Sequence, residues 1–253
     1  MLAALVQVFA AEARAVTMAW SPVGNPGNAA DTVTPNPGVG AVGHDYKIGT
    51  YDVTNSQYAE FLNTTDPTGM NTLALWDSHM SFPSTENGGI NFTLSNASGN
   101  KYTPVPSREN RPVNWVNWYS AVRFANWLNN GQGSSDTESG AYALLGGTPI
   151  PSNGSNVARS PGAIVFLPSE DEWYKAAYYN SATSSYFLYP TSSDVSPIAS
   201  DPTGLPNHAN FLPGGANSLT DVGAYTSTIS PYGAFDMGGN VSQWDEDVFW
   251  NWA

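Results

Sequence analysis

The stretch that decides the fold runs from Arg111 to Asn129 and reads RPVNWVNWYSAVRFANWLN. It opens as an extended segment, because Pro112 cannot continue a helix and biases the residue before it away from helical angles. Asn117 then has the chemistry of a helix N-cap, with a side-chain oxygen that can accept an unpaired backbone N–H. We predict that the central helix of the protein begins here and that most other segments are wrapped around it.

The apolar side chains of this helix recur at helical spacing. An i, i+3, i+4, i+7 pattern predicts one apolar helix face, and its members are Ala121, Phe124, Ala125 and Leu128. Three tryptophans add bulk that a single helix cannot bury alone: Trp115, Trp118 and Trp127. We therefore expect this helix to pack against several other elements.

Two further helices are predicted from capping boxes, in which a hydroxyl residue is followed three positions later by Gln or Glu. Thr54 and Gln57 form the first, and the helix that follows should end near Asn63. Ser169 and Glu172 form the second. Three acidic residues, 170–172, open that helix and suit the positive end of the helix dipole, so we expect a structural role for them rather than acid–base catalysis.

Between the helices the sequence predicts short strands and long loops. We expect strands at Val16 to Trp20, within His44 to Val53, at Ala163 to Leu167 and at Val222 to Tyr225. Residues 64–110 should form a loop excursion with a small hairpin, and residues 131–161 a second excursion. Loops this long in a compact domain are usually functional or variable.

The composition describes a compact, loop-rich protein with few charges. Of the 253 residues 41% are hydrophobic and 13% aromatic, and there are 24 Gly and 19 Pro. Only 11% are charged, against about 25% in typical domains. We expect residues 16–253 to form one domain, because no segment resembles a linker between two cores.

The net charge of −13 excludes nucleic acid and anionic membranes as partners, since both require clustered Lys and Arg. No Lys or Arg follows Lys175. The carboxylates of that acidic half are either solvated or hold a cation. No apolar run approaches the length of about 18 residues that a membrane span needs, so we expect no such span.

The start of the chain resembles an export signal. Leu2 to Ala11 is apolar, and Ala13-Arg14-Ala15 resembles the end of a signal peptide. We expect residues 1–15 to be the remnant of a signal peptide and the protein to be extracellular or at the cell surface. An apolar N-terminal strand is the alternative, because the basic region of a signal peptide is missing.

Six blocks of the sequence, in order, resemble the sulfatase-modifying-factor family, whose named member is the formylglycine-generating enzyme. They are YDVTNSQYAEF (51–61), RPVNWVNW (111–118), AVRFANWL (121–128), FLPSEDEWYKAA (166–177), HANF (208–211) and YGAFDMGGNV (232–241). The resemblance implies an α+β, C-type-lectin-like fold with about three helices, few short strands and long ordered loops. It also implies kinship with exported bacterial proteins.

This sequence departs from the family at its catalytic centre. The oxidases of the family use a pair of cysteines to hold copper, whereas this chain has no cysteine, so we expect no copper. In the family those cysteines and the closing strand follow the segment that corresponds to GNVSQW (239–244) here, beyond the end of this chain. We therefore expect a domain that is incomplete at its C-terminus, with an unpaired sheet edge through which it self-associates.

The resemblance also implies two calcium sites in loops, made of oxygen ligands as calcium prefers. One would use Asn210, the carbonyl of Phe211 and Asn217, with Asp221 as a rival to Asn217. The other would use Asp236, the carbonyls of Gly239 and Val241, and Gln243, where the family has Glu. We expect weak calcium binding, because Gln lacks the charge of Glu. The alternative is that these residues only hold turns.

No other pattern predicts catalysis. His44, His79 and His208 do not have the spacing of a metal site, and there is no Gly-x-Ser-x-Gly elbow. We predict a non-catalytic binding or surface module of an exported bacterial protein, with an unknown protein or glycan as its ligand. The alternatives are a formylglycine-generating-type oxidase or related oxidoreductase whose catalytic segment lies downstream, and a structural component that self-associates.

Overall fold

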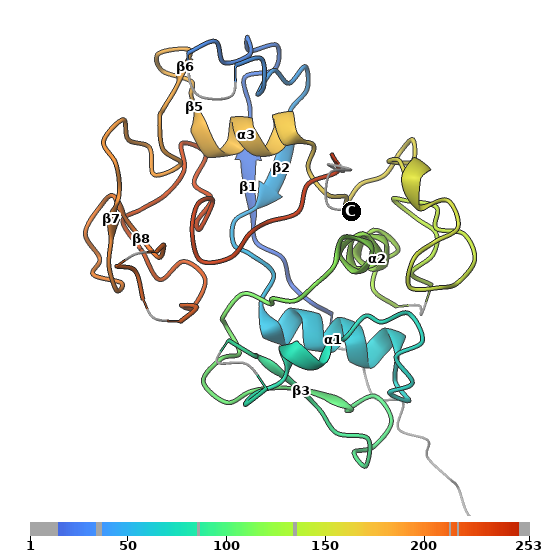
Figure 1. Cartoon of the computed structure of the whole chain (residues 1–253). Helices are drawn as coiled ribbons and strands as arrows, with labels where there is room; N and C mark the ends of the chain where they lie inside the picture. Colours follow the sequence, from blue (N-terminus) through green and yellow to red (C-terminus); the bar gives the residue numbers. More distant parts are fainter. Residues whose placement is uncertain are drawn as a thin grey trace, which may run out of the picture.

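The computed structural model describes residues 15–33, 37–84, 87–133, 136–212, 214–216 and 218–247. Within these residues it contains three α-helices, two short 3-10 helices and four two-stranded sheets, joined by long loops (Figure 1). The predicted α+β fold with few short strands is therefore confirmed. No helix in these ranges is both long enough and apolar enough to cross a membrane.

Helix α2, Trp118–Asn129, lies at the centre of the molecule (Figure 1). Its cap is the predicted one, because the Asn117 side-chain oxygen accepts the N–H of Ser120 at 2.9 Å. The helix is buried on more than the predicted face, since Val122 and Trp127 are 0% and 1% exposed. Its neighbours enclose it on several sides, whereas the i, i+3, i+4 pattern anticipates one apolar face.

Helix α1, Asn55–Thr65, begins with the predicted capping box, in which Thr54 and Gln57 exchange hydrogen bonds. It packs on α2 through aromatic rings. Phe61 meets Phe124 edge to face with ring centres 5.3 Å apart, and it contacts Trp127 at 5.5 Å. Such pairs add about 0.5–1.5 kcal/mol each to the burial of the rings.

Helix α3, Glu170–Tyr178, is also capped as predicted, by Ser169 and Glu172. It lies over a ribbon formed by β1, Trp20–Val23, and β2, Tyr46–Gly49 (Figure 1). Ala176 and Ala177 are fully buried against Val23 of this ribbon. The small side chains let the helix approach the ribbon closely.

The remaining strands form three further pairs. The predicted hairpin is β3, Ile90–Phe92, with β4, Tyr102–Pro104. The others are β5, Tyr179–Asn180, with β6, Ser185–Tyr186, and the parallel pair of β7, Ile198–Ala199, with β8, His208–Ala209. The 3-10 helices are Ser78–Met80 and Gly154–Asn156.

Three of the predicted strands are wrong or displaced. The first begins at Trp20 rather than at Val16. Ala163 to Leu167 is not a strand, because side chains take its N–H groups: Ile164 donates to Asn129 at 2.8 Å and Leu167 to Tyr142 at 3.0 Å. Residues 222–225 form a turn, in which the N–H of Ala224 donates to the carbonyl of Asp221.

Candidate binding cavity

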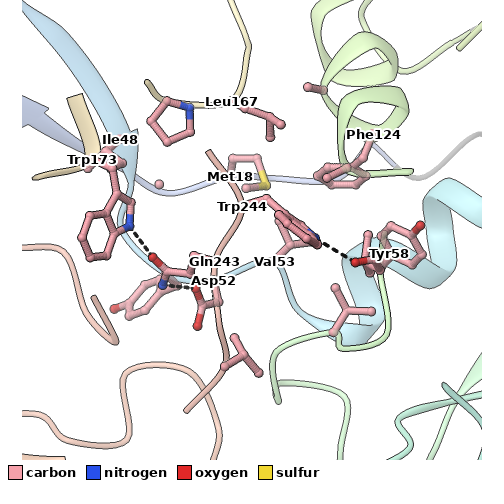
Figure 2. Close-up of a pocket in the computed structure, with 18 of the residues that line it drawn as sticks. Met18, Ile48, Asp52, Val53, Tyr58, Phe124, Leu167, Trp173, Gln243 and Trp244 are labelled. Atoms are coloured by element: carbon pink, nitrogen blue, oxygen red, sulfur yellow. Dashed lines mark hydrogen bonds between the residues drawn. The ribbon is translucent and has the colours of Figure 1, made fainter. Parts of the chain in front are cut away.

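A cavity of about 690 Å³ lies at the centre of the molecule, between the β1–β2 ribbon and helices α1, α2 and α3. Figure 2 shows side chains from all these elements converging on it. The stretch 241–244 near the C-terminal end closes one wall. Segments far apart in the sequence therefore share one space.

The predicted apolar face of α2 forms a wall of this cavity. Ala121, Phe124, Ala125 and Leu128 all line it. The periodicity identified a real face, which borders the cavity while Phe124 and Ala125 also belong to the buried core. Residues 165–168, from the segment that was predicted to be a strand, continue the same wall.

Aromatic rings supply much of the remaining lining. Tyr51 and Phe235 stack with ring centres 5.1 Å apart. Trp20 and Trp244 also line the cavity and remain 41% and 51% exposed. The indole N–H of Trp244 donates to the Val116 carbonyl at 2.8 Å, which holds this ring at the cavity.

The polar part of the lining is a corner made by Asp52, Gln243 and Trp173 (Figure 2). The Gln243 amide nitrogen donates to Asp52 Oδ1 at 2.6 Å and to the carbonyl of Asp236 at 3.0 Å. The Gln243 amide oxygen accepts the indole N–H of Trp173 at 2.6 Å. The other carboxylate oxygen, Asp52 Oδ2, is buried and has no hydrogen-bond partner among the described residues.

Burial controls the charge of this corner. Burial, and next the charge of Asp236, raise the pKa of Asp52 to about 8, although the Gln243 hydrogen bond lowers it. Burial also raises the pKa of Asp236, against a hydrogen bond that its Oδ2 accepts from Gly223 at 2.6 Å. Two neighbouring carboxyl groups in an apolar setting each resist ionisation.

The second predicted calcium site lies at this corner. Asp236 and Gln243 are brought together, but Gln243 presents its NH₂ group, not its oxygen, to Asp236 and Asp52. As arranged, Gln243 does not fit the role of a calcium ligand. Asp236, Gly239 and Val241 keep the oxygens that the prediction requires, so calcium at this turn stays a prediction.

The first predicted site adjoins the second. The N–H of Asn240 donates to the Asn210 carbonyl at 2.8 Å. Gly239 has φ +96°, and a Cβ there would lie 2.6 Å from that carbonyl oxygen, so only glycine fits.

The other predicted ligands of the first site are arranged differently. The Phe211 carbonyl accepts the N–H of Gly215 at 2.8 Å, and Asp221 is exposed. Asn217 lies outside the described residues. Within the described ranges no three His, Cys, Asp or Glu side chains converge as a metal site would require.

A partly buried ionic cluster ties the C-terminal stretch to α3. Arg159 bridges Glu172 at 2.7 Å and Glu246 at 2.6 Å. Its guanidinium also lies 3.7 Å from the ring centre of Phe166, a cavity residue. Burial opposes ionisation of Glu172, but its bonds to Arg159 lower its pKa overall. The predicted structural role of the acids at this helix start agrees with these contacts.

The family known as sulfatase-modifying factor enzyme 1-like domain matches residues 10–253. The chain belongs to this family. The resemblance inferred from the six sequence blocks is thus confirmed, and the family's fold agrees with the three helices, short strands and long loops described above. No curated protein matches the chain.

Two solved structures share the fold of this sulfatase-modifying-factor domain. The crystal structure of CarF is 20% identical with a TM-score of 0.57, over 91% of this chain and 80% of CarF. Variable protein 1 of Treponema denticola is 16% identical with a TM-score of 0.51, over 92% of this chain and 75% of that protein. At these identities the likeness concerns the fold alone.

Many of the cavity residues lie in the family motifs, but the sequence did not predict the cavity. Asp52 lies in the first block and Trp173 in the fourth, and 191 positions separate Asp52 from Gln243. Two other tryptophans serve the core and not the cavity: Trp118 is 9% exposed, and Trp76 packs against the ring of Phe92. Trp115 is 52% exposed and lines the cavity.

Proposed function

We propose that this sulfatase-modifying-factor domain is a non-catalytic binding module and that the central cavity is its ligand site. The observation that carries the proposal is the cavity itself. Its volume of about 690 Å³ falls within the ~300–1,000 Å³ of small-molecule sites. Such sites combine an apolar and aromatic lining with a few placed polar groups, which is the composition found here.

The same lining supports a non-catalytic role. The 253 residues contain no cysteine, so the copper chemistry of the family's oxidases has no ligands in this chain. Within the described lining, Ser242 is the sole hydroxyl residue besides two tyrosines, and no histidine accompanies it. An activated nucleophile requires such a base.

Export and exposure at the cell surface are part of the proposal and rest on the sequence. Leu2 to Ala11 and the Ala13-Arg14-Ala15 group support them, and these residues lie outside the described ranges except for Ala15. Detection of the protein in the medium or on intact cells would test this part. Recovery from the cytoplasm alone would contradict it.

Ligand binding is tested with a neutral apolar fluorophore, N-phenyl-1-naphthylamine. We expect saturable, one-to-one binding with enhanced probe emission and quenching of tryptophan emission, because Trp20, Trp173 and Trp244 line the cavity. Sedimentation of the same samples shows whether the protein that binds the probe is a monomer. It thereby distinguishes ligand binding from the alternative role as a self-associating structural component. Absence of saturable binding by the monomer would overturn the proposal.

A further inference from the structure

The cavity lining contains an acidic group that no basic side chain of the described residues accompanies. Asp52 is an acidic lining residue, and no Lys, Arg or His side chain of the described part of the chain lines the same space. The nearby Asp236 adds a second carboxyl group at this corner rather than a positive charge. A carboxylate in an apolar setting is unfavourable unless a cation or hydrogen-bond donors accompany it.

The neighbours of Asp52 provide a hydrogen-bond donor to one of its carboxylate oxygens and none to the other. Oδ1 accepts from the Gln243 amide, while Oδ2 is buried without a partner in the described residues. The Gln243 amide cannot also serve Oδ2. It has two N–H bonds to give, and these go to Asp52 Oδ1 and the Asp236 carbonyl. A hydrogen-bond donor is therefore missing from this corner.

We propose that the ligand of this cavity is an amphiphilic amine, whose ammonium group pairs with Asp52 and whose apolar body fills the remaining space. This inference rests on the proposed binding function and names its ligand class. An ammonium supplies the positive charge that this corner lacks and further N–H donors for the Asp52 carboxylate. The aliphatic and aromatic walls formed by α2 and residues 165–168 would receive the apolar body.

Aromatic rings in the same lining favour the same ligand. Tyr51 is adjacent to Asp52 in the sequence, and its ring stacks on Phe235 at 5.1 Å. Both rings line the cavity. A cation within about 6 Å of an aromatic ring centre is attracted to the ring face. The walls would thus stabilise an ammonium as well as an alkyl chain.

A comparison of three probes of equal length tests the charge preference: octylamine, 1-octanol and octanoate. Each is titrated against the full chain by calorimetry, and tryptophan emission is followed in parallel. We expect octylamine to bind at least about tenfold more tightly than 1-octanol, since a charge-assisted bond is added. Octanoate should bind most weakly, because it brings a second negative charge to Asp52.

The matched variants are Asp52→Asn and Asp201→Asn. The first removes the charge but keeps an acceptor for Gln243, and the second removes an exposed acid outside the cavity. Asp52→Asn should bring the octylamine affinity to within about twofold of that of 1-octanol. Asp201→Asn should change neither the affinity for octylamine nor that for 1-octanol.

The outcomes separate the two proposals. If octylamine and 1-octanol bind the wild-type chain equally, the amine inference is wrong and the binding function stands. The same holds if Asp52→Asn leaves the preference for octylamine intact. If none of the three probes binds, the proposed function itself is contradicted. The wild-type comparison does not depend on how well either variant folds.

Discussion

The indole N–H of Trp173 donates to the amide oxygen of Gln243 at 2.6 Å, and this bond fixes the direction of the amide. An indole nitrogen is a donor only, so the Gln243 oxygen must face it. The NH₂ group therefore faces Asp52 and the Asp236 carbonyl. Gln243 supplies neutral donors where the family's Glu would bring a negative charge.

Gln243→Glu should destabilise the domain and make it calcium-dependent. The substitution removes both N–H bonds and places a third acid beside Asp52 and Asp236, which should cost about 2–4 kcal/mol in unfolding free energy. Millimolar calcium should restore much of this loss, and equal magnesium should not. Calcium should raise the melting temperature of the wild-type protein by a smaller amount. Asp236→Ala in the wild-type background should abolish that rise. Thermal melts in chelator, calcium and magnesium measure all three proteins.

Gln57→Glu is the matched control for that substitution. Position 57 closes the capping box of α1, where Glu serves as well as Gln. Its melting temperature should not respond to calcium more than that of wild type. A calcium response of equal size in wild type and Gln243→Glu would contradict the role given to the amide.

The unfolding free energy should decrease between pH 5 and pH 8, in part because of Asp52. Burial raises the pKa of Asp52 to about 8, whereas in the unfolded chain it is about 3.9. The folded state thus binds a proton that the unfolded state has released over this range, so raising the pH favours unfolding. Asp52→Asn should flatten this slope in urea titrations.

Asp245 accounts for part of the same slope and serves as an internal reference. Burial, and next the charge of Asp247, raise the pKa of Asp245 to about 6. The loss of stability between pH 5 and pH 6 should therefore persist in Asp52→Asn. An identical slope in the variant and in wild type up to pH 8 would contradict the assignment to Asp52.

Arg159→Met should lower the unfolding free energy by about 2–4 kcal/mol, because it leaves Glu172 and Glu246 facing each other without their shared cation. Urea unfolding at neutral pH measures the change. Lys47→Met, at an exposed position of β2, should stay within about 0.5 kcal/mol of wild type. Equal effects of the two substitutions would show that the cluster does not tie residue 246 to α3.

The chain should not convert a cysteine-containing sulfatase-type peptide to formylglycine, with or without copper, because it has no cysteine to hold the metal. Mass spectrometry of the peptide after incubation measures the conversion. Copper-dependent loss of the peptide thiol would contradict a non-catalytic role and favour the oxidase alternative.

The helices could be predicted from the sequence because their signals are local. Thr54, Asn117 and Ser169 each cap the helix expected of them, since a cap depends on residues a few positions away. The strand predicted at Ala163 to Leu167 failed because strand formation needs a distant partner. Here the side chains of Asn129 and Tyr142 take the backbone groups instead.

Most of the candidate site could not be predicted from the sequence. The α2 face was predicted, but periodicity does not indicate that part of such a face borders a cavity. Asp52 lies in a quoted motif without any local feature that marks it. Its significance comes from Gln243 and Asp236, which the fold brings to it from the other end of the chain.

The central claim is that the cavity binds an apolar ligand, and filling the cavity tests it most directly. Ala121 lines the cavity from α2, and Ala121→Phe would place a ring in that space. Ala182→Phe adds the same ring at an exposed turn. Affinity for N-phenyl-1-naphthylamine is measured by fluorescence titration of both variants, with melts to confirm folding. The account predicts that Ala121→Phe loses at least about tenfold in affinity while Ala182→Phe binds as wild type does, and equal binding by the two folded variants would contradict it.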